Sequence, residues 1–177
     1  QTFDAANKEL GMHNTMMKVI YPFLYKTGIF WSVNNAMPAQ EHFASNIIRK
    51  KLITATAALS VKNKKPKKAL LFLPEGEWHE IGLLFADHII RSKGHNVYYL
   101  GQNVPYDNVY AVAEAVEPDM LMMFYVTPKP QEEIDKEIKM LAVKNAGKKV
   151  LVAGNTTLFS KKKEKNVTYM TGVNDLE

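Results

Sequence analysis

Short apolar runs alternate with helical periods from residue 68 to the end of the chain, and this alternation limits the fold more than any other feature. The apolar runs predict strands at 69–73, 96–100, 120–125, 150–153 and 167–170, and the intervening segments predict helices at 80–93, 106–117 and 131–146. Strands that are apolar throughout are typical of a parallel sheet covered on both faces. We therefore predict an α/β fold with a doubly wound parallel sheet.

The first third of the chain has a helical period instead of a strand pattern. Its longest apolar stripe has spacings of three and four residues and comprises Ala44, Ile48, Leu52, Ala55 and Leu59. This stripe predicts a helix at 38–61, which begins at Pro38, a residue type favoured in the first helical turn. Shorter helices are predicted at 3–10, 13–21 and 22–33, with a break or kink at Pro22.

The positive charge of the chain is concentrated between these two parts. The net charge of +5 equals the charge of five lysines, which are Lys62, Lys64, Lys65, Lys67 and Lys68. A DNA-reading surface would spread basic residues along a helix or a stripe. Because these lysines surround Pro66, we favour a solvated linker over a phosphate-binding arm. The predicted domains are a helical bundle at 1–61, a linker at 62–68 and an α/β domain at 69–177.

Several classes of protein are excluded by what the sequence lacks. It has no cysteine, which rules out disulfides, thiolate metal sites and cysteine nucleophiles. The lack of cysteine is compatible with a reducing compartment, so we expect a protein of the cytoplasm. The longest apolar run, 120–126, is much shorter than the ~20 residues that cross a bilayer, so we do not expect a membrane protein. No nucleophile elbow, phosphate-binding loop or catalytic carboxylate pair is recognisable, so we predict that the chain is not an enzyme.

The loop after the first predicted strand carries the strongest candidate for a binding site. Ligands of such sheets bind beyond the carboxyl ends of the strands. Glu77 stands two residues before His79 in that loop. A carboxylate placed there can accept one ring N–H, which fixes the histidine tautomer and raises its basicity. This chemistry suits a metal ligand, although one protein histidine is enough only when a cofactor supplies the other ligands.

Two segments of the α/β half resemble a known cofactor-binding domain. Glu77-x-His79-x-x-Gly82 resembles the cobalamin-binding signature, which is usually Asp-x-His-x-x-Gly. The sequence around Gly101, followed by Pro105, is similar to the second loop of the same Rossmann-like, flavodoxin-like domains. The resemblance implies that His79 is the lower axial ligand of cobalt and that Glu77 is its hydrogen-bonding partner. It also implies that Gly82 lets the nucleotide tail of the cofactor pass close to the helix start.

The helical half carries a second, independent match. Trp31, followed after nine residues by Glu41 and His42, resembles the helical cap of cobalamin-dependent MerR-type transcription regulators, the group that includes light-sensing repressors. The two matches stand in the order of that family and cover both halves. The resemblance implies that these three residues lie over the upper face of the corrin ring, so that the cofactor is held between bundle and sheet.

The sequence departs from the family where the nucleotide tail would be buried. The family has Ser-x-Leu after the third strand and Gly-Gly after the fourth. Counting from Gly82 places these motifs at 125–127 and 154–155, where only Gly154 matches. Tyr125 would fill the groove, and overpacking of this kind costs roughly 1 to 3 kcal/mol. Thr127 also departs from the pattern, and so does Asn155.

Taken together, the resemblance implies a sensory and oligomerisation domain of a MerR-family transcription regulator. It would bind adenosyl- or methylcobalamin, form a homo-oligomer, and contact DNA only through a domain that precedes Gln1. Two alternatives remain open. One is a vestigial domain that has lost cobalamin and binds a protein or another small ligand, and the other is a corrinoid carrier protein that serves a methyltransferase.

Overall fold

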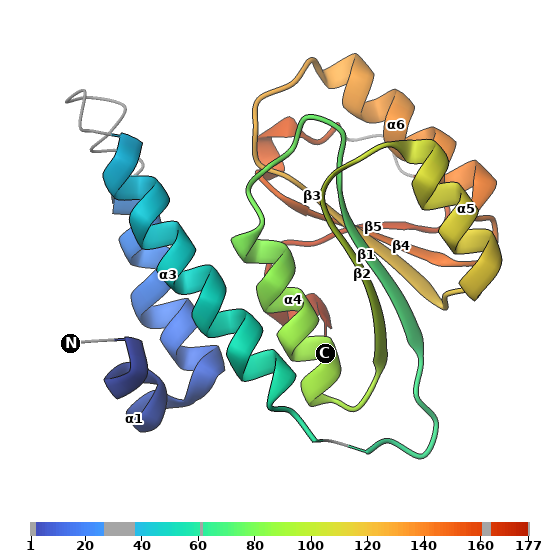
Figure 1. Ribbon diagram of the computed structural model, residues 1–177. Helices are drawn as coiled ribbons and strands as arrows, with labels where there is room; N and C mark the ends of the chain where they lie inside the picture. Colours follow the sequence, from blue (N-terminus) through green and yellow to red (C-terminus); the bar gives the residue numbers. More distant parts are fainter. Residues whose placement is uncertain (1–2, 27–37, 61, 161–163, 177) are drawn as a thin grey trace. The chain divides into compact units, whose positions relative to one another are not determined.

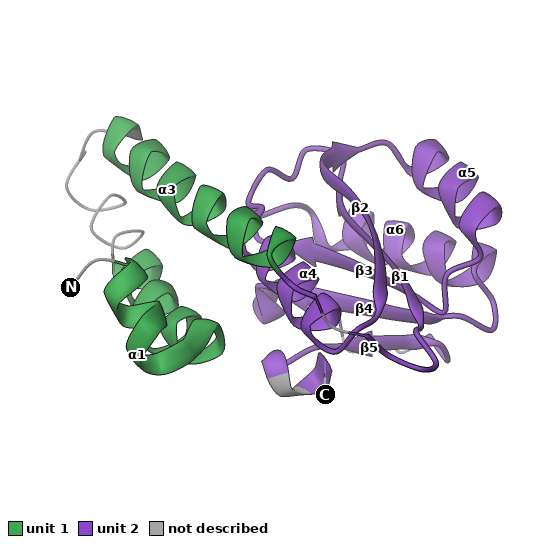
Figure 2. Cartoon of the chain, turned by 60° about the horizontal axis from the view of Figure 1, so that its bottom comes forward, with its two compact units in different colours: residues 1–58 green, residues 59–177 purple. Residues whose placement is uncertain are grey.

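The computed structural model describes residues 3–26, 38–60, 62–160 and 164–176 (Figure 1). The chain divides into two compact units, unit 1 at residues 1–58 and unit 2 at residues 59–177 (Figure 2). None of the described helices is long and apolar enough to cross a membrane.

Unit 2 is built on a parallel sheet of five strands in the order β2-β1-β3-β4-β5. The strands are β1 (Lys68–Pro74), β2 (Asn96–Val104), β3 (Met120–Tyr125), β4 (Lys149–Gly154) and β5 (Val167–Tyr169). The helices are α4 (Ile81–Ser92), α5 (Tyr106–Val116) and α6 (Gln131–Lys144), with short 3₁₀ turns η2 (Thr156–Leu158) and η3 (Val173–Leu176). The predicted α/β fold with a doubly wound parallel sheet is confirmed.

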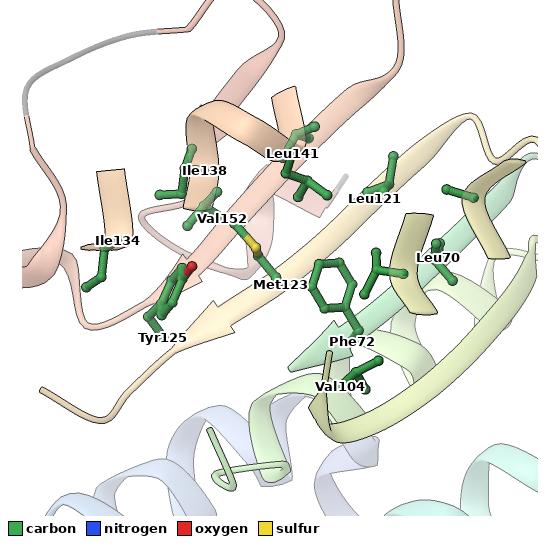
Figure 3. Packing of buried hydrophobic residues seen from close by; sticks show 13 residues of the cluster. Leu70, Phe72, Val104, Leu121, Met123, Tyr125, Ile134, Ile138, Leu141 and Val152 are labelled. Atoms are coloured by element: carbon green, nitrogen blue, oxygen red, sulfur yellow. The ribbon is translucent and has the colours of Figure 1, made fainter. Parts of the chain in front are cut away.

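Each face of the sheet packs against its own layer (Figure 1). On one face, side chains of β1, β3 and β4 pack against α5 and α6 in a core cluster that includes Phe72, Met123 and Tyr125 (Figure 3). On the other face, Leu71, Met122 and their neighbours pack against α4. Because successive residues of a strand point to opposite faces, Tyr125 and Phe124 at the end of β3 belong to different layers.

Strand β2 is longer than predicted. It continues from Leu100 to Val104, so Gly101 lies in the strand and not in the predicted loop. The pairing with β1 shifts by one residue there, from Leu71 opposite Tyr99 to Phe72 opposite Gly101. Gly101 adopts a φ of 83°, which glycine tolerates at such a bulge.

Unit 1 contains α1 (Phe3–Thr15), the π-helical turn η1 (Met16–Ile20) and α3 (Pro38–Ala57). Gly11 interrupts α1 with φ 74° and ψ 162°, close to the predicted boundary between the first two helices. The chain remains helical on both sides of Pro22, so of the predicted break or kink the break does not occur. Instead, the N–H of Tyr21 donates to the carbonyl of Met16, and this wider turn directly precedes the proline, which has no N–H to donate.

Helix α3 ends earlier than predicted. The prediction extended it to residue 61, but it ends at Ala57 and leaves Leu59 outside the helix. The β-branched Thr54 and Thr56 lower the helix propensity of this last segment. Ile48 and Leu52, at the centre of the predicted stripe, are buried.

The lysine-rich segment 62–67 is exposed and forms neither helix nor strand. It is nevertheless attached to the turn between α4 and β2. The side-chain amide of Asn63 donates to the carbonyl of Lys93 at 3.1 Å, and the N–H of Lys67 donates to His95 Nδ1 at 3.2 Å.

Candidate functional site

A buried carboxylate joins two loops at the carboxyl edge of the sheet. Glu77, in the loop after β1, is only 3% exposed. Its Oε2 accepts hydrogen bonds from the N–H groups of Val126 and Thr127 at 2.8 and 2.7 Å. Its Oε1 accepts from the N–H groups of Trp78 and His79 at 2.9 and 3.0 Å, and from Thr127 Oγ1 at 3.1 Å. One side chain thus fixes the loop after β1 to the loop after β3.

A tight turn directs Glu77 into this position. The N–H of Glu77 donates to the carbonyl of Pro74 at 3.0 Å, and Gly76 adopts the positive φ of 83° that the third residue of a type II turn requires. Strand β2 supports the turn, because Asn103 accepts from the N–H of Gly76 at 2.8 Å and its own N–H donates to the carbonyl of Glu77 at 3.1 Å. The extended end of β2 is therefore part of the site's framework.

The predicted pair of Glu77 and His79 forms a direct hydrogen bond. His79 Nδ1 lies 2.6 Å from Glu77 Oε1, and 3.2 Å from Thr127 Oγ1. Burial alone would raise the pKa of Glu77, but the hydrogen bonds from the His79 ring, Thr127, Val126 and the His79 N–H outweigh it and hold this pKa well below its usual range. An ionised Glu77 can only accept, so Nδ1 carries the proton and the imidazole lone pair lies on Nε2.

This arrangement can present an oriented imidazole as a metal ligand. The His79 side chain is 53% exposed, whereas its partner carboxylate is buried. In the described residues, no three His, Asp or Glu side chains gather into a possible metal site. His79 could therefore hold a metal ion as one ligand of a complex whose other ligands come from a bound group.

Gly82, the last residue of the predicted signature, lies in the first turn of α4 and contacts Phe124. A Cβ added at Gly82 would lie 2.8 Å from Cε1 and 3.1 Å from Cδ1 of the Phe124 ring. Phe124 is partly buried and packs against the cluster on the α4 side of the sheet. The sequence prediction did not include Phe124, although the alternation of side chains along β3 could have indicated it.

Tyr125, predicted to fill the groove of the nucleotide tail, has its side chain on the face of the sheet opposite Phe124 and Gly82. Its side chain is 2% exposed and belongs to the core beneath α5 and α6 (Figure 3). The hydroxyl group donates to Glu137 at 2.7 Å and lies 2.9 Å from the hydroxyl of Tyr106. Burial is the main reason why the pKa of Tyr125 is raised far above its usual range. The structure therefore does not bring Tyr125 and Gly82 together.

Gly154, Gly101 and Thr127 serve the framework of the site in different ways. A Cβ added at Gly154 would lie 2.0 Å from the carbonyl oxygen of Tyr125, at a φ of 116°. At Gly101 an added Cβ would make an ordinary contact of 3.5 Å with Glu80, so the positive φ and not crowding explains the glycine. Thr127 binds Glu77 through its N–H and its hydroxyl, a role that the sequence prediction did not contain.

The predicted cap residues belong to unit 1. Trp31 lies outside the described residues. Glu41 and His42 lie near the start of α3, where Glu41 is half-buried and His42 is exposed. The carbonyl of His42 accepts a hydrogen bond from the Asn46 side chain at 2.8 Å.

Comparison with known sequences identifies two bacterial relatives, while no protein family model matches the chain. The chain is 33% identical over 114 residues to the HTH-type transcriptional repressor CarA of Myxococcus xanthus, covering 64% of this chain and 38% of the repressor. It is 30% identical over 124 residues to the repressor CarH of the same organism, covering 70% and 41%. The expected relationship is confirmed: the chain is a homologue of these repressors and spans about two fifths of their length.

Comparison with solved structures supports the fold. The Methanosarcina barkeri monomethylamine corrinoid protein matches with a TM-score of 0.72 at 16% identity, over 94% of this chain and 80% of that protein. At this identity the likeness concerns the fold alone, and it agrees with the predicted helical part followed by an α/β domain.

Proposed function

We propose that this chain binds a corrinoid cofactor, cobalamin, as the ligand-sensing part of a transcription regulator, and that His79 Nε2 coordinates cobalt from the lower face. The observation that carries the proposal is the 2.6 Å hydrogen bond between His79 Nδ1 and the buried carboxylate of Glu77. The homology with two transcriptional repressors supports the regulatory context.

The residues present fit the lower side of such a cofactor. A corrin ring would supply four nitrogen ligands to the metal, so His79 would need to supply only one more. Glu77 fixes the tautomer of His79 and strengthens Nε2 as a donor, as carboxylates commonly do for metal-binding histidines. Thr127 and Val126 hold the carboxylate through three hydrogen bonds, so the orientation of the ring depends on both loops.

Unit 1 is proposed to supply the upper side of the binding site. In this proposal Trp31, Glu41 and His42 contact the adenosyl or methyl group of the cofactor, and the helical bundle acts as a cap. The regulator is proposed to act as a homo-oligomer whose assembly depends on the cofactor. It would contact DNA through a domain outside this sequence, in keeping with the two-fifths coverage of the helix-turn-helix repressors.

Spectroscopy after gel filtration tests this proposal. Purified protein is incubated in the dark with hydroxo-, methyl- or adenosylcobalamin and separated from free cofactor. The wild type should retain at least one form with a spectrum of histidine-ligated cobalt. His79→Ala should lose that spectrum and weaken retention, whereas the matched control His13→Ala, an exposed histidine of α1, should not.

The outcome also separates the alternatives. A wild type that emerges colourless with every form of cobalamin, and also with cobinamide, a corrinoid without the nucleotide tail, contradicts the proposal and favours a vestigial domain. Retention of cobalamin without any change of assembly state, measured by light scattering, would contradict the sensing role and favour a corrinoid carrier.

A further inference from the structure

The side chain that fills the space at the start of α4 is Phe124. Gly82 has no side chain, and the Phe124 ring approaches it so closely that a Cβ there would be only 2.8 Å from the ring. The ring is only partly buried, whereas its strand neighbours Met123 and Tyr125 are enclosed in the opposite core. Phe124 therefore fills the space next to Gly82 on the α4 side of the sheet, beside the loop that carries His79.

If the proposed function holds, the position of the Phe124 ring affects which corrinoids the site can accept. If His79 coordinates cobalt, the benzimidazole of a cobalamin is released from the metal, and its nucleotide tail then needs space elsewhere in the site. Gly82 follows His79 by three residues and is the second residue of α4, where it has no side chain. Phe124 occupies the space that this glycine leaves.

We infer that Phe124 is a specificity-determining residue, which makes the site favour corrinoids without a nucleotide tail, such as cobinamide, over cobalamins. This inference rests on the proposed function and names the class of corrinoid that the same site takes. A tail that enters beside Gly82 must displace the ring. Overpacking of a filled site at this scale reduces affinity by about tenfold to a hundredfold.

Paired titrations of wild type and variants test the inference. The absorbance change on cobalt ligation gives the dissociation constants of cobinamide and hydroxocobalamin for the wild type, Phe124→Ala and Met123→Ala. The control Met123→Ala removes a neighbouring side chain that points to the opposite face. The ratio of the cobalamin to the cobinamide dissociation constant is compared between the three proteins. Cobalamin must also release its own benzimidazole from cobalt, but the free-energy cost of that step is the same in every protein.

Phe124→Ala should strengthen cobalamin binding by about tenfold and change cobinamide binding by less than about threefold. Met123→Ala should leave the ratio unchanged. Circular dichroism checks that each variant is folded, and Phe124→Leu, which retains more volume, replaces Phe124→Ala if that variant unfolds.

An unchanged ratio in the Phe124 variants would overturn the inference and leave the proposed function intact. If neither corrinoid binds the wild type, the proposed function fails and the inference fails with it.

Discussion

Replacing Glu77 by glutamine tests the framework of the site without any cofactor. The carboxylate accepts two backbone N–H groups on Oε2, from Val126 and Thr127, and two on Oε1, from Trp78 and His79. In Glu77→Gln the amide oxygen can take only one of these two positions. The NH₂ group then faces N–H groups at the other position, so two backbone donors lose their acceptor in either orientation.

The expected cost follows from these two donors. A buried donor without an acceptor costs about 1 to 3 kcal/mol, so Glu77→Gln should lower the free energy of unfolding of unit 2 by about 2 to 6 kcal/mol at neutral pH. Glu75, exposed in the same loop, offers a matched control. Glu75→Gln should change the stability by less than about 0.5 kcal/mol.

The difference between wild type and Glu77→Gln should also depend on pH. Burial raises the pKa of Glu77 in the folded chain, but its hydrogen bonds outweigh burial, so this pKa is depressed. In the unfolded chain the pKa is about 4.3. Above about pH 5 the group is ionised in both states, and its stabilisation is fully present. As the pH falls below about 4.3, only the unfolded chain takes up the proton, so the wild type loses about 1.4 kcal/mol per pH unit from this group.

Urea unfolding followed by circular dichroism, from pH 7 to pH 3, measures this effect. The advantage of the wild type over Glu77→Gln should be present at pH 7 and shrink as the pH falls below about 4.3. An advantage below about 0.5 kcal/mol at pH 7, or one that grows as the pH falls from about 4.3 to 3, would refute the reasoning from the hydrogen bonds.

Three further outcomes are expected from other parts of the chain. Gly154→Ala should lower the free energy of unfolding by more than about 2 kcal/mol, because Gly154 has a φ of 116° and a Cβ there would lie 2.0 Å from the Tyr125 carbonyl oxygen. The control Gly172→Ala, where a Cβ would meet no atom within 4 Å, should be near neutral, and equal effects of the two substitutions would contradict the strand geometry. Tyr125→Phe should cost about 1 to 2 kcal/mol through loss of the bond to Glu137, without changing corrinoid affinity, and a change in the titrated affinity would place Tyr125 at the ligand. Any DNA binding by residues 1–177 should be indifferent to sequence and fall steeply with salt, since the positive excess lies in segment 62–68; sequence-specific retardation at physiological salt would show otherwise.

Much of the sheet was predictable, because buried parallel strands are continuous apolar runs. Strands β1, β3 and β4 each begin and end within one residue of their predicted limits. Strand β2 was not predictable to its end, since Gly101 and Asn103 are residue types that strands disfavour. Pairing with β1 and the contacts of Asn103 with the Gly76 turn extend the strand, and both are tertiary interactions.

The site shows the same division between local and tertiary information. Glu77 and His79 are two residues apart, so their pairing follows from the sequence alone. The donors Val126 and Thr127 stand 49 and 50 residues from Glu77, and only the order of the strands brings them to it. That Tyr125 fills the groove of the nucleotide tail stays a prediction. A position counted along the chain does not give the face of a strand, and the structure places the Tyr125 side chain on the face opposite Phe124.

Coordination of cobalt by His79 is the central claim, and electron paramagnetic resonance tests it most directly. Cobalamin bound to protein that carries ¹⁵N-labelled histidine is reduced to the Co(II) state, in which the axial nitrogen splits each cobalt line. The account predicts a two-line splitting from ¹⁵N in the wild type and its loss in His79→Ala. A three-line splitting from ¹⁴N in the labelled protein would show that the cofactor's own benzimidazole remains on cobalt, and would contradict the claim.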